Sequence, residues 1–291
     1  MKDETKHVKP LGGRAYGHIP HLPGSRMGPA DHHIDPGNAL IATEKPRDRR
    51  DVVVVQEKLD GCCMAVACID GRRGDMIVPM TRAGYHAADA TYEMQRMFVG
   101  WVSETREAFE DILKRGERLV GEWLIQAHGT RYKLPHGPFV AFDIMEGKRR
   151  LPYLEFLARI GGRLPTPRLL SYGPPMSIED ALWWLKLSGH GATDPVEGAV
   201  WRVERGGEVQ FLAKYVRPEK VDGQYLPDVS GGEPVWNECL GYEPHETPRD
   251  YGPRDFGGHE IPESEAPDPW PLSLGRPGDR HPEDPRTIGG Q

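Results

Sequence analysis

Cysteine is scarce in this chain, which has only four among 291 residues, at positions 62, 63, 68 and 239. None of the four forms a Cys-x-x-Cys pair, and three fall within seven residues of one predicted strand. This pattern argues against a disulfide framework and against a zinc ribbon. The expected setting is therefore a reducing cytoplasm.

Long apolar runs are missing as well. No stretch approaches the ~20 residues that a membrane span needs, and residues 1–7 precede no apolar segment of the kind that follows the start of a secretory signal. We therefore expect neither a membrane protein nor a secreted one, and the sequence leaves the oligomeric state open.

The usual glycine-rich phosphate loops are not present either. There is no G-x-x-x-x-G-K-[ST] motif, and the glycines at 12, 13 and 17 follow no predicted strand, so they are not a dinucleotide fingerprint. The twelve histidines show no helical zinc spacing. Nucleotide binding, if it occurs, needs another kind of site.

Glycine and proline are abundant, at 63 of 291 residues together, a share of about 22% against roughly 12% in average proteins. Many turns and long loops follow from this, and a helical bundle does not. Short apolar and β-branched runs outnumber helical patterns, which predicts an α+β protein with mainly antiparallel sheets. The predicted strands lie at 52–55, 62–69, 76–82, 119–125, 139–145, 196–204 and 209–216, and the predicted helices at 89–115 (divided at Gly100), 154–160 and 178–187.

Charge divides the chain unevenly. Residues 232–291 hold 13 acidic and 5 basic side chains and 11 of the 28 prolines, so they account for the whole net charge of −7. We predict a loop-rich leader at 1–50 packed on the core, a central domain at 51–241, and an acidic Pro/Gly-rich tail at 242–291 that is mostly disordered. The tail either solubilises the protein or docks as an acidic strip on a basic groove.

The most informative stretch is Lys58-Leu59-Asp60-Gly61. It places a lysine directly after a buried strand and before a tight turn, where the amine emerges near the core. One interpretation is a lysine whose stem packs on apolar neighbours and whose head reaches water. The other is a nucleophile, which requires neighbouring charges that lower its pKa.

Further charged side chains occur inside predicted strands or at their ends, where solvated surface positions explain them poorly. Together they describe a pocket of lysines, an arginine and carboxylates suited to a polyphosphate with Mg²⁺. These residues are Arg82, Glu122, Asp143, Glu197 and Lys214.

The order and spacing of these pieces resemble the covalent nucleotidyltransferases, a superfamily of ATP-dependent DNA ligases, RNA ligases and mRNA-capping guanylyltransferases. Within it, Gly-Glu-Trp-Leu at 121–124, Ala-Phe-Asp-Ile at 141–144 and Lys-Tyr-Val-Arg-Pro at 214–218 resemble the RNA ligase branch most closely. The resemblance covers about residues 16–237. It implies a nucleotidyltransferase (ATP-grasp-like ligase) fold with flanking helices and no oligonucleotide-binding barrel.

The resemblance implies sealing of 5′-phosphate and 3′-OH RNA ends with ATP and Mg²⁺, or Mn²⁺, through a lysyl-AMP intermediate. Lys58 would be the nucleophile, Lys214 would contact the α-phosphate, and Glu197 would help to hold the metal. Phe142 would stack on adenine, while Asp143 is expected to be structural. The remaining nucleotide contacts would come from Glu57, Asp60, Gly61, Arg82 and Glu122.

RNA ends would be the substrate partner, and an end-healing kinase or phosphatase is a possible second one. Basic residues next to aromatic or histidine neighbours are the candidate RNA contacts, with ordinary solvated loop charges as the alternative. They are Arg26, Arg131, Lys133 and Arg217.

One feature of the motifs, the residue five positions after Lys58, keeps other functions open. Cys63 stands five residues after Lys58, where such RNA ligases usually have Asn or Arg, and a thiol is a weak hydrogen-bond partner. A catalytically idle nucleotide- or RNA-binding relative is therefore one alternative. DNA ligases and capping enzymes are the others, although these normally carry a barrel after the last motif, and only 74 residues follow Arg217.

Overall fold

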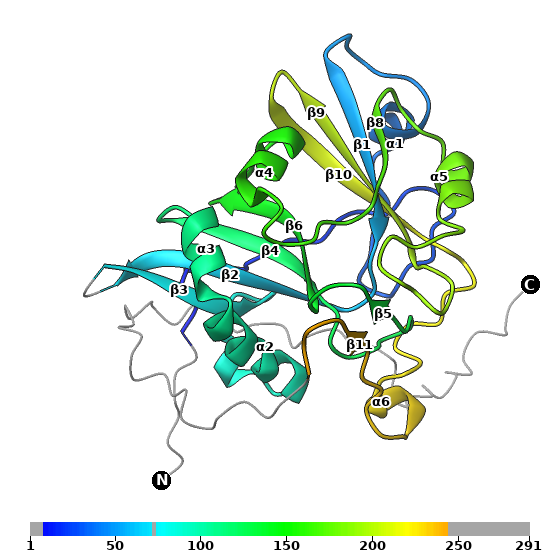
Figure 1. Cartoon of the computed structure of the whole chain (residues 1–291). Coiled ribbons are helices and arrows are strands. Elements are labelled where there is room, and N and C mark those ends of the chain that lie inside the picture. Colours follow the sequence, from blue (N-terminus) through cyan, green and yellow to red (C-terminus); the bar gives the residue numbers. More distant parts are fainter. Residues whose placement is uncertain (1–7, 72–73, 244–291) are drawn as a thin grey trace, which may run out of the picture.

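The computed structural model describes residues 8–71 and 74–243 and contains three sheets (Figure 1). The part of the predicted 242–291 tail from residue 244 onward lies outside the described residues, as do residues 72–73. Both large sheets are antiparallel throughout. The predicted α+β class with mainly antiparallel sheets is confirmed.

The first sheet carries the nucleophile candidate. Its order is β10 (Glu208–Val216), β9 (Gly198–Arg205), β1 (Asp51–Lys58) and β8 (Leu169–Gly173). The valine run at 52–55 makes β1 a central strand, because β-branched side chains pack well on both faces of a pleated sheet. Val53 and Val55 pack in one cluster with Trp201 and with residues of α1 (Pro36–Thr43) and α5 (Ile178–Trp184).

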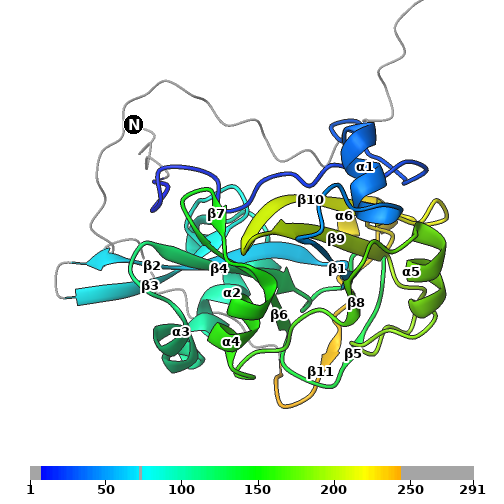
Figure 2. The same ribbon diagram turned by 90° about the horizontal axis from the view of Figure 1, so that it is seen from above.

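The second sheet has the order β3 (Gly74–Thr81), β2 (Cys62–Gly71), β4 (Glu117–Trp123), β6 (Phe139–Glu146) and β7 (Arg149–Arg150). Helices α2 (Glu93–Glu104), α3 (Arg106–Ile112) and α4 (Tyr153–Ile160) lie on one side of it (Figure 2). An aromatic cluster forms the core between helices and sheet. Its members include Phe98, Trp101, Phe109, Trp123 and Phe139.

Smaller elements complete the chain. Strands β5 (Lys133–Leu134) and β11 (Glu238–Cys239) form a parallel pair. A 3₁₀ helix, η1 (Ala87–Asp89), follows β3, and a single turn of helix, α6 (Pro227–Ser230), follows β10. In the described part of the chain, no helix has the length and apolar character to cross a membrane.

One local prediction is wrong, and the loop-rich leader contains a helix that was not predicted. Helix α1 begins at Pro36, where Asp35 caps it by accepting hydrogen bonds from the backbone N–H groups of Gly37 and Asn38. The helical stretch around 89–115 divides at Thr105 and not at Gly100. The Thr105 hydroxyl donates to the Trp101 carbonyl at 2.6 Å, a local bond that competes with continued helix. Strand β8 was not predicted.

A buried ionic cluster joins the two large sheets. Asp143 on β6 is fully buried and contacts the guanidinium of Arg202 on β9. It also accepts a hydrogen bond from the Tyr16 hydroxyl at 2.6 Å and pairs with Arg150 at 3.1 Å. Arg202 donates in addition to the Phe142 carbonyl at 3.1 Å. These contacts show that Asp143 has a structural role, which is what the sequence analysis expected of it.

Candidate active site

The site forms where β1 ends beside the start of β9. Antiparallel pairing places Lys58 opposite Gly198, so that Glu197 is the next residue beyond the pair. The Lys58 amine lies 2.6 Å from Oε2 of Glu197 and also donates to its neighbour's carbonyl, that of Leu59, at 3.3 Å. Strand β9 packs so closely on β10 at this point that a Cβ on Gly198 would lie 1.8 Å from the Tyr215 carbonyl oxygen.

A cavity of about 480 Å³ opens over this pair and lies between the two large sheets and the leader. Apolar and charged side chains both line it. The apolar ones include Phe142 from β6, Val200 from β9 and Leu212 from β10, and the charged ones include Lys58, Arg82, Glu122, Glu197 and Lys214. The structure therefore brings together the lysines, the arginine and the carboxylates that the sequence analysis selected, and leaves Asp143 behind the cavity wall.

Lys58 is held as an ammonium group in this arrangement. Burial alone would lower its pKa, but the carboxylates of Glu197 and Glu122 outweigh burial and raise the pKa above the ordinary lysine value. An amine must be neutral to attack phosphorus. The Lys58–Glu197 pair would therefore have to open before Lys58 could act as a nucleophile.

Glu122 extends from β4 into the same cavity. Its Oε1 accepts a hydrogen bond from the backbone N–H of Gly61 at 3.1 Å. Burial raises the pKa of Glu122 to about 7, although the charge on Lys58 opposes this. Its protonation therefore changes near neutral pH, and with it the charge beside the lysine.

Lys214 approaches from the opposite wall. Burial and the nearby charge of Lys58 lower its pKa, while Asp31 of the leader, 3.4 Å from the amine, opposes them. Asp31 also lies 3.1 Å from Nε2 of the buried His21. The leader thus holds the second lysine in place, a contact that the sequence did not reveal.

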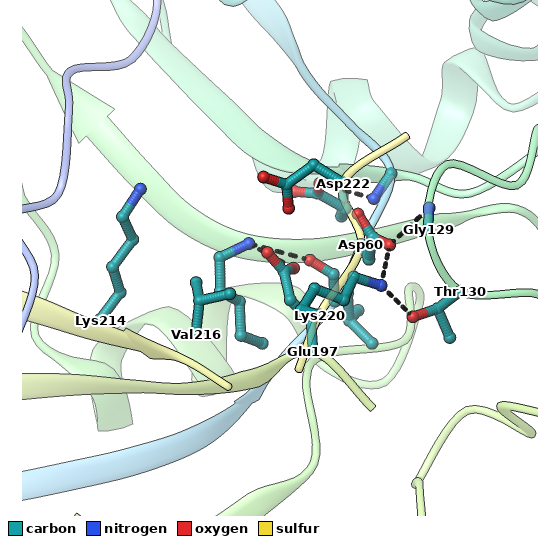
Figure 3. A network of polar contacts seen from close by, with 12 residues as sticks. Asp60, Gly129, Thr130, Glu197, Lys214, Val216, Lys220 and Asp222 are labelled. Carbon is teal, nitrogen blue, oxygen red and sulfur yellow. Dashed lines mark hydrogen bonds and ion pairs between the residues drawn. The ribbon is translucent and has the colours of Figure 1, made fainter. Parts of the chain in front are cut away.

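The Asp60 carboxylate forms an ion pair with Lys220 and not with Lys58. Figure 3 shows this pair beside Glu197, with Lys214 standing apart from them. Lys220 is only 5% exposed and was missed by sequence reasoning. It follows Arg217-Pro218-Glu219, where nothing local distinguishes it from a surface lysine.

Two other predicted nucleotide contacts have defined positions. The Glu57 carboxylate is buried against Ser188 and Gly189, at 2.6 and 2.8 Å, so only its backbone is free to meet a ligand in the cavity. Arg82 donates to the Gly17 carbonyl at 2.8 Å and so ties the end of β3 to the leader.

The predicted RNA contacts already have protein partners. Arg26 pairs with Asp222 at 2.8 Å, Arg131 with Asp194 at 2.9 Å, and Lys133 with Glu238 at 3.2 Å. The Arg217 guanidinium donates to the Val196 carbonyl. Only Arg26 of the four lines the cavity. The structure does not bring these four side chains together.

Cys63 lies on β2 directly opposite Glu122 on β4 and also lines the cavity. Burial and the charge of Glu122 raise the pKa of its thiol well above the usual value. The side chain is therefore a neutral thiol at physiological pH and supplies no positive charge to the site.

A lysine at the end of β1, paired with a carboxylate just before β9 beside a cavity between two antiparallel sheets, fits the nucleotidyltransferase fold. The sequence profile of the RNA ligase family matches residues 51–216, which is more than half of the chain. The chain belongs to the RNA ligase family, as the sequence motifs predicted.

Several solved structures are similar to this chain. Two are forms of an archaeal ATP-dependent RNA ligase: form 2 has 24% identity over 58% of this chain and 43% of that chain, with a TM-score of 0.41. Form 1 has 21% identity over 69% and 48%, with a TM-score of 0.43. A Naegleria gruberi RNA ligase variant with ATP and Mn has 16% identity over 58% and 51%, with a TM-score of 0.41. The chain thus spans about half the length of these ligases. A comparison with curated protein sequences finds no match.

Proposed function

We propose that this protein is an ATP-dependent RNA ligase that joins a 5′-phosphate to a 3′-OH and so acts in RNA repair. The observation that carries the proposal is the position of Lys58. Its amine lies in a cavity between Glu197, Glu122 and Lys214, and the cavity has apolar walls wide enough for a nucleotide.

In the first step, neutral Lys58 would attack the α-phosphorus of ATP. A P–N bond forms to Nζ, the bond from the α-phosphorus to the bridging oxygen breaks, and pyrophosphate leaves with that electron pair. The AMP group then passes to the 5′-phosphate of an RNA end, and a 3′-OH displaces AMP to seal the two ends. In-line geometry and neutralised phosphate charge are the main demands of such transfers.

The nucleotide is expected to bind with its base on the apolar side of the cavity. Phe142 would stack on adenine, opposite Val200 and Leu212, all of which line the cavity. Lys214 would contact the α-phosphate, while Arg82 and Glu122 would orient phosphate and ribose oxygens. The backbone around Glu57, Asp60 and Gly61 would border the ribose, since these residues lie in the same cavity wall.

The residues present fit one Mg²⁺ or Mn²⁺ ion that is held mainly by substrate. No group of three His, Cys, Asp or Glu side chains in the described residues could hold a metal alone. Mg²⁺ keeps several waters and needs only one or two carboxylates beside phosphate oxygens, and Glu197 provides one. Such an ion would neutralise phosphate charge and take from Lys58 the carboxylate that stabilises its ammonium form.

The cavity rim supports an acidic, phosphorylated substrate. Arg14 and His18 of the leader lie 3.4 Å apart, next to the cavity-lining Gly17 and Arg82. Within residues 8–71 and 74–243, Arg14, His18 and Arg82 have no carboxylate within ion-pair distance. We therefore place the RNA end at this rim and not at the four cations named above, because Arg26, Arg131 and Lys133 are paired with carboxylates and Arg217 lies outside the cavity lining.

The decisive experiment incubates the purified protein with Mg²⁺ and α-labelled ATP and measures label that stays on the denatured chain. Labelling is expected with ATP, not with GTP, and not in the Lys58→Ala variant. Sealing is then tested on nicked and single-stranded RNA and on DNA. Labelling with GTP would favour a capping activity, and sealing of DNA alone would favour a DNA ligase.

A second candidate is a catalytically idle relative that binds nucleotide or RNA, and Cys63 is the observation that favours it. Its neutral thiol stands where a polar or cationic side chain is expected. Nucleotide binding without any labelling of Lys58, in folded protein freed of AMP, would establish this candidate.

The cytoplasm remains the proposed location, since all four cysteines are free thiols. An end-healing kinase or phosphatase remains a proposed partner.

A further inference from the structure

Lys220 is a buried lysine that lies outside the motifs and four residues beyond the end of β10. Its amine donates to Oδ2 of Asp60 and to the hydroxyl of Thr130, which is itself fully buried (Figure 3). A buried ammonium group is costly unless it is paired and hydrogen-bonded. The Lys220 ammonium group is therefore not explained as a solubilising surface charge, and another role is needed for it.

The Asp60 carboxylate is bound on a second side by the loop after β4. The backbone N–H of Gly129 donates to Oδ2 of Asp60 at 2.8 Å. Residue 129 has to be glycine here, because a Cβ would lie 2.4 Å from the Val221 carbonyl oxygen and 2.9 Å from the Lys220 amine. The close packing of the Gly129 loop on Lys220 restricts the Asp60 carboxylate to one orientation.

Lys220 links the chain segment that carries Lys58 to the segment that carries Glu197. On one side, Asp60 is two residues from Lys58, and its backbone N–H donates to the Tyr132 hydroxyl at 3.1 Å. On the other side, the backbone N–H of Lys220 donates to Arg217 at 3.1 Å, and that of Arg217 donates to Glu197 at 3.0 Å. The Lys220 side chain thus spans from the segment bonded to Glu197 to the loop that follows Lys58.

We propose that Lys220 is a positioning residue for the Lys58 nucleophile. The Lys58–Glu197 pair has to open when ATP and its metal enter, and the Lys220–Asp60 pair then keeps the loop after Lys58 fixed against the Glu197 segment. The inference rests on the proposed function, and it adds to it a residue beyond the matched region 51–216.

The chemistry separates this role from a merely structural one. Formation of lysyl-AMP depends on where Lys58 stands, whereas sealing of an RNA that already carries AMP on its 5′-phosphate does not use Lys58 as a nucleophile. A residue that positions Lys58 therefore affects the first reaction and spares the last. A residue that only stabilises the fold affects both alike.

The test compares Lys220→Met, Asp60→Asn and the double variant with the unchanged chain. We measure kcat and KM for ATP in lysyl-AMP formation, the rate of sealing of pre-adenylylated RNA, and Tm. Lys220→Met is expected to lower kcat of the first reaction by about 10- to 100-fold, the scale of a misplaced reacting group. KM and the sealing rate should stay within about 3-fold, and the double variant should be no slower than either single variant, because two residues that act through one contact are not additive.

Arg205→Met is the matched control, because it breaks another ion pair, with Asp51 at 2.6 Å, at the far end of β1. It is expected to lower Tm without changing the ratio of the two rates. If Lys220→Met does not fold, Lys220→Arg and Thr130→Val replace it. The arginine variant keeps a cation beside Asp60, so it should retain more lysyl-AMP formation than the valine variant, which removes the hydroxyl bonded to Lys220.

Unchanged lysyl-AMP formation in Lys220→Met, or an equal loss in both reactions, would overturn the inference. A lack of lysyl-AMP in the unchanged chain, by contrast, would overturn the proposed function. The two failures are therefore distinguishable in the same assay.

Discussion

The Nζ atom of Lys58 and the Oε2 atom of Glu197 lie 2.6 Å apart, although 139 residues separate them in the chain. The antiparallel pairing of β1 with β9 creates this contact. The contact gives Glu197 two successive tasks under the proposed function, first as counter-ion of the lysine and then as a metal ligand.

Replacing this carboxylate should abolish the first reaction. Glu197→Gln is expected to slow lysyl-AMP formation by at least about 100-fold, because the loss of a metal ligand removes several kcal/mol of charge stabilisation. The control is Glu204→Gln, which changes another buried carboxylate near the other end of β9 that accepts a hydrogen bond from the Tyr153 N–H at 2.7 Å. Equal effects of the two substitutions would contradict the assignment of Glu197.

The raised pKa of Glu122 predicts a pH-dependent stability. The folded chain keeps the Glu122 proton up to about pH 7, whereas the unfolded chain releases it near pH ~4.3. Between these values the folded state binds more protons, so this group lowers the free energy of unfolding as pH rises. Glu122→Gln cannot ionise and keeps an oxygen for the Gly61 N–H.

At pH 8 this variant is expected to be roughly 1–3 kcal/mol more stable than the unchanged chain, and the difference should vanish near pH 4. Urea unfolding at a series of pH values measures it. Parallel stability curves for the two proteins would show that Glu122 is already ionised in the folded chain.

Phe142 should contribute to nucleotide affinity more than to the rate of chemistry. Phe142→Ala is expected to raise KM for ATP by about 5- to 150-fold, which corresponds to base stacking worth ~1–3 kcal/mol. Phe142→Tyr keeps an aromatic face and should stay near the unchanged value. An alanine variant with unaltered KM but a lower Tm would assign Phe142 to packing against Tyr16, whose ring centroid is 5.3 Å away.

Arg14 should affect RNA and not ATP. Arg14→Ala is expected to lower sealing of a 5′-phosphorylated RNA by about 10-fold at low salt, since a charged hydrogen bond contributes about 1.5–3 kcal/mol. Lysyl-AMP formation should not change. Arg131→Ala is the matched control, because Arg131 is bound to Asp194. A larger sealing defect in the Arg131 variant would contradict the placement at the rim and would favour Arg131 as the RNA contact, as the sequence analysis suggested.

The sequence selected residues that the structure brings to one cavity, because they lie within strands or at strand ends. Lys58, Glu197 and Lys214 each border or occupy a strand, and antiparallel pairing has few ways to arrange such ends. The valine run of β1 and the apolar hairpin of β9 and β10 were readable for the same reason.

The rest depended on contacts between distant segments. Lys220 looks like any surface lysine until the chain folds it onto Asp60, 160 residues away. Arg131 looked free because its partner Asp194 lies 63 residues further along. Only α1 had a local signal that could have been read, an aspartate cap followed by proline at the first helical position.

The ionic cluster around Asp143 limits how far the two large sheets can separate. Arg202 on β9 contacts the Asp143 carboxylate and donates to the Phe142 carbonyl, both on β6, beside the cavity. Separation of the sheets would break these buried charged contacts and would leave Asp143 without its partners. Under the proposed function, the cavity is therefore formed before ATP binds, which spares ATP the entropic cost of ordering it.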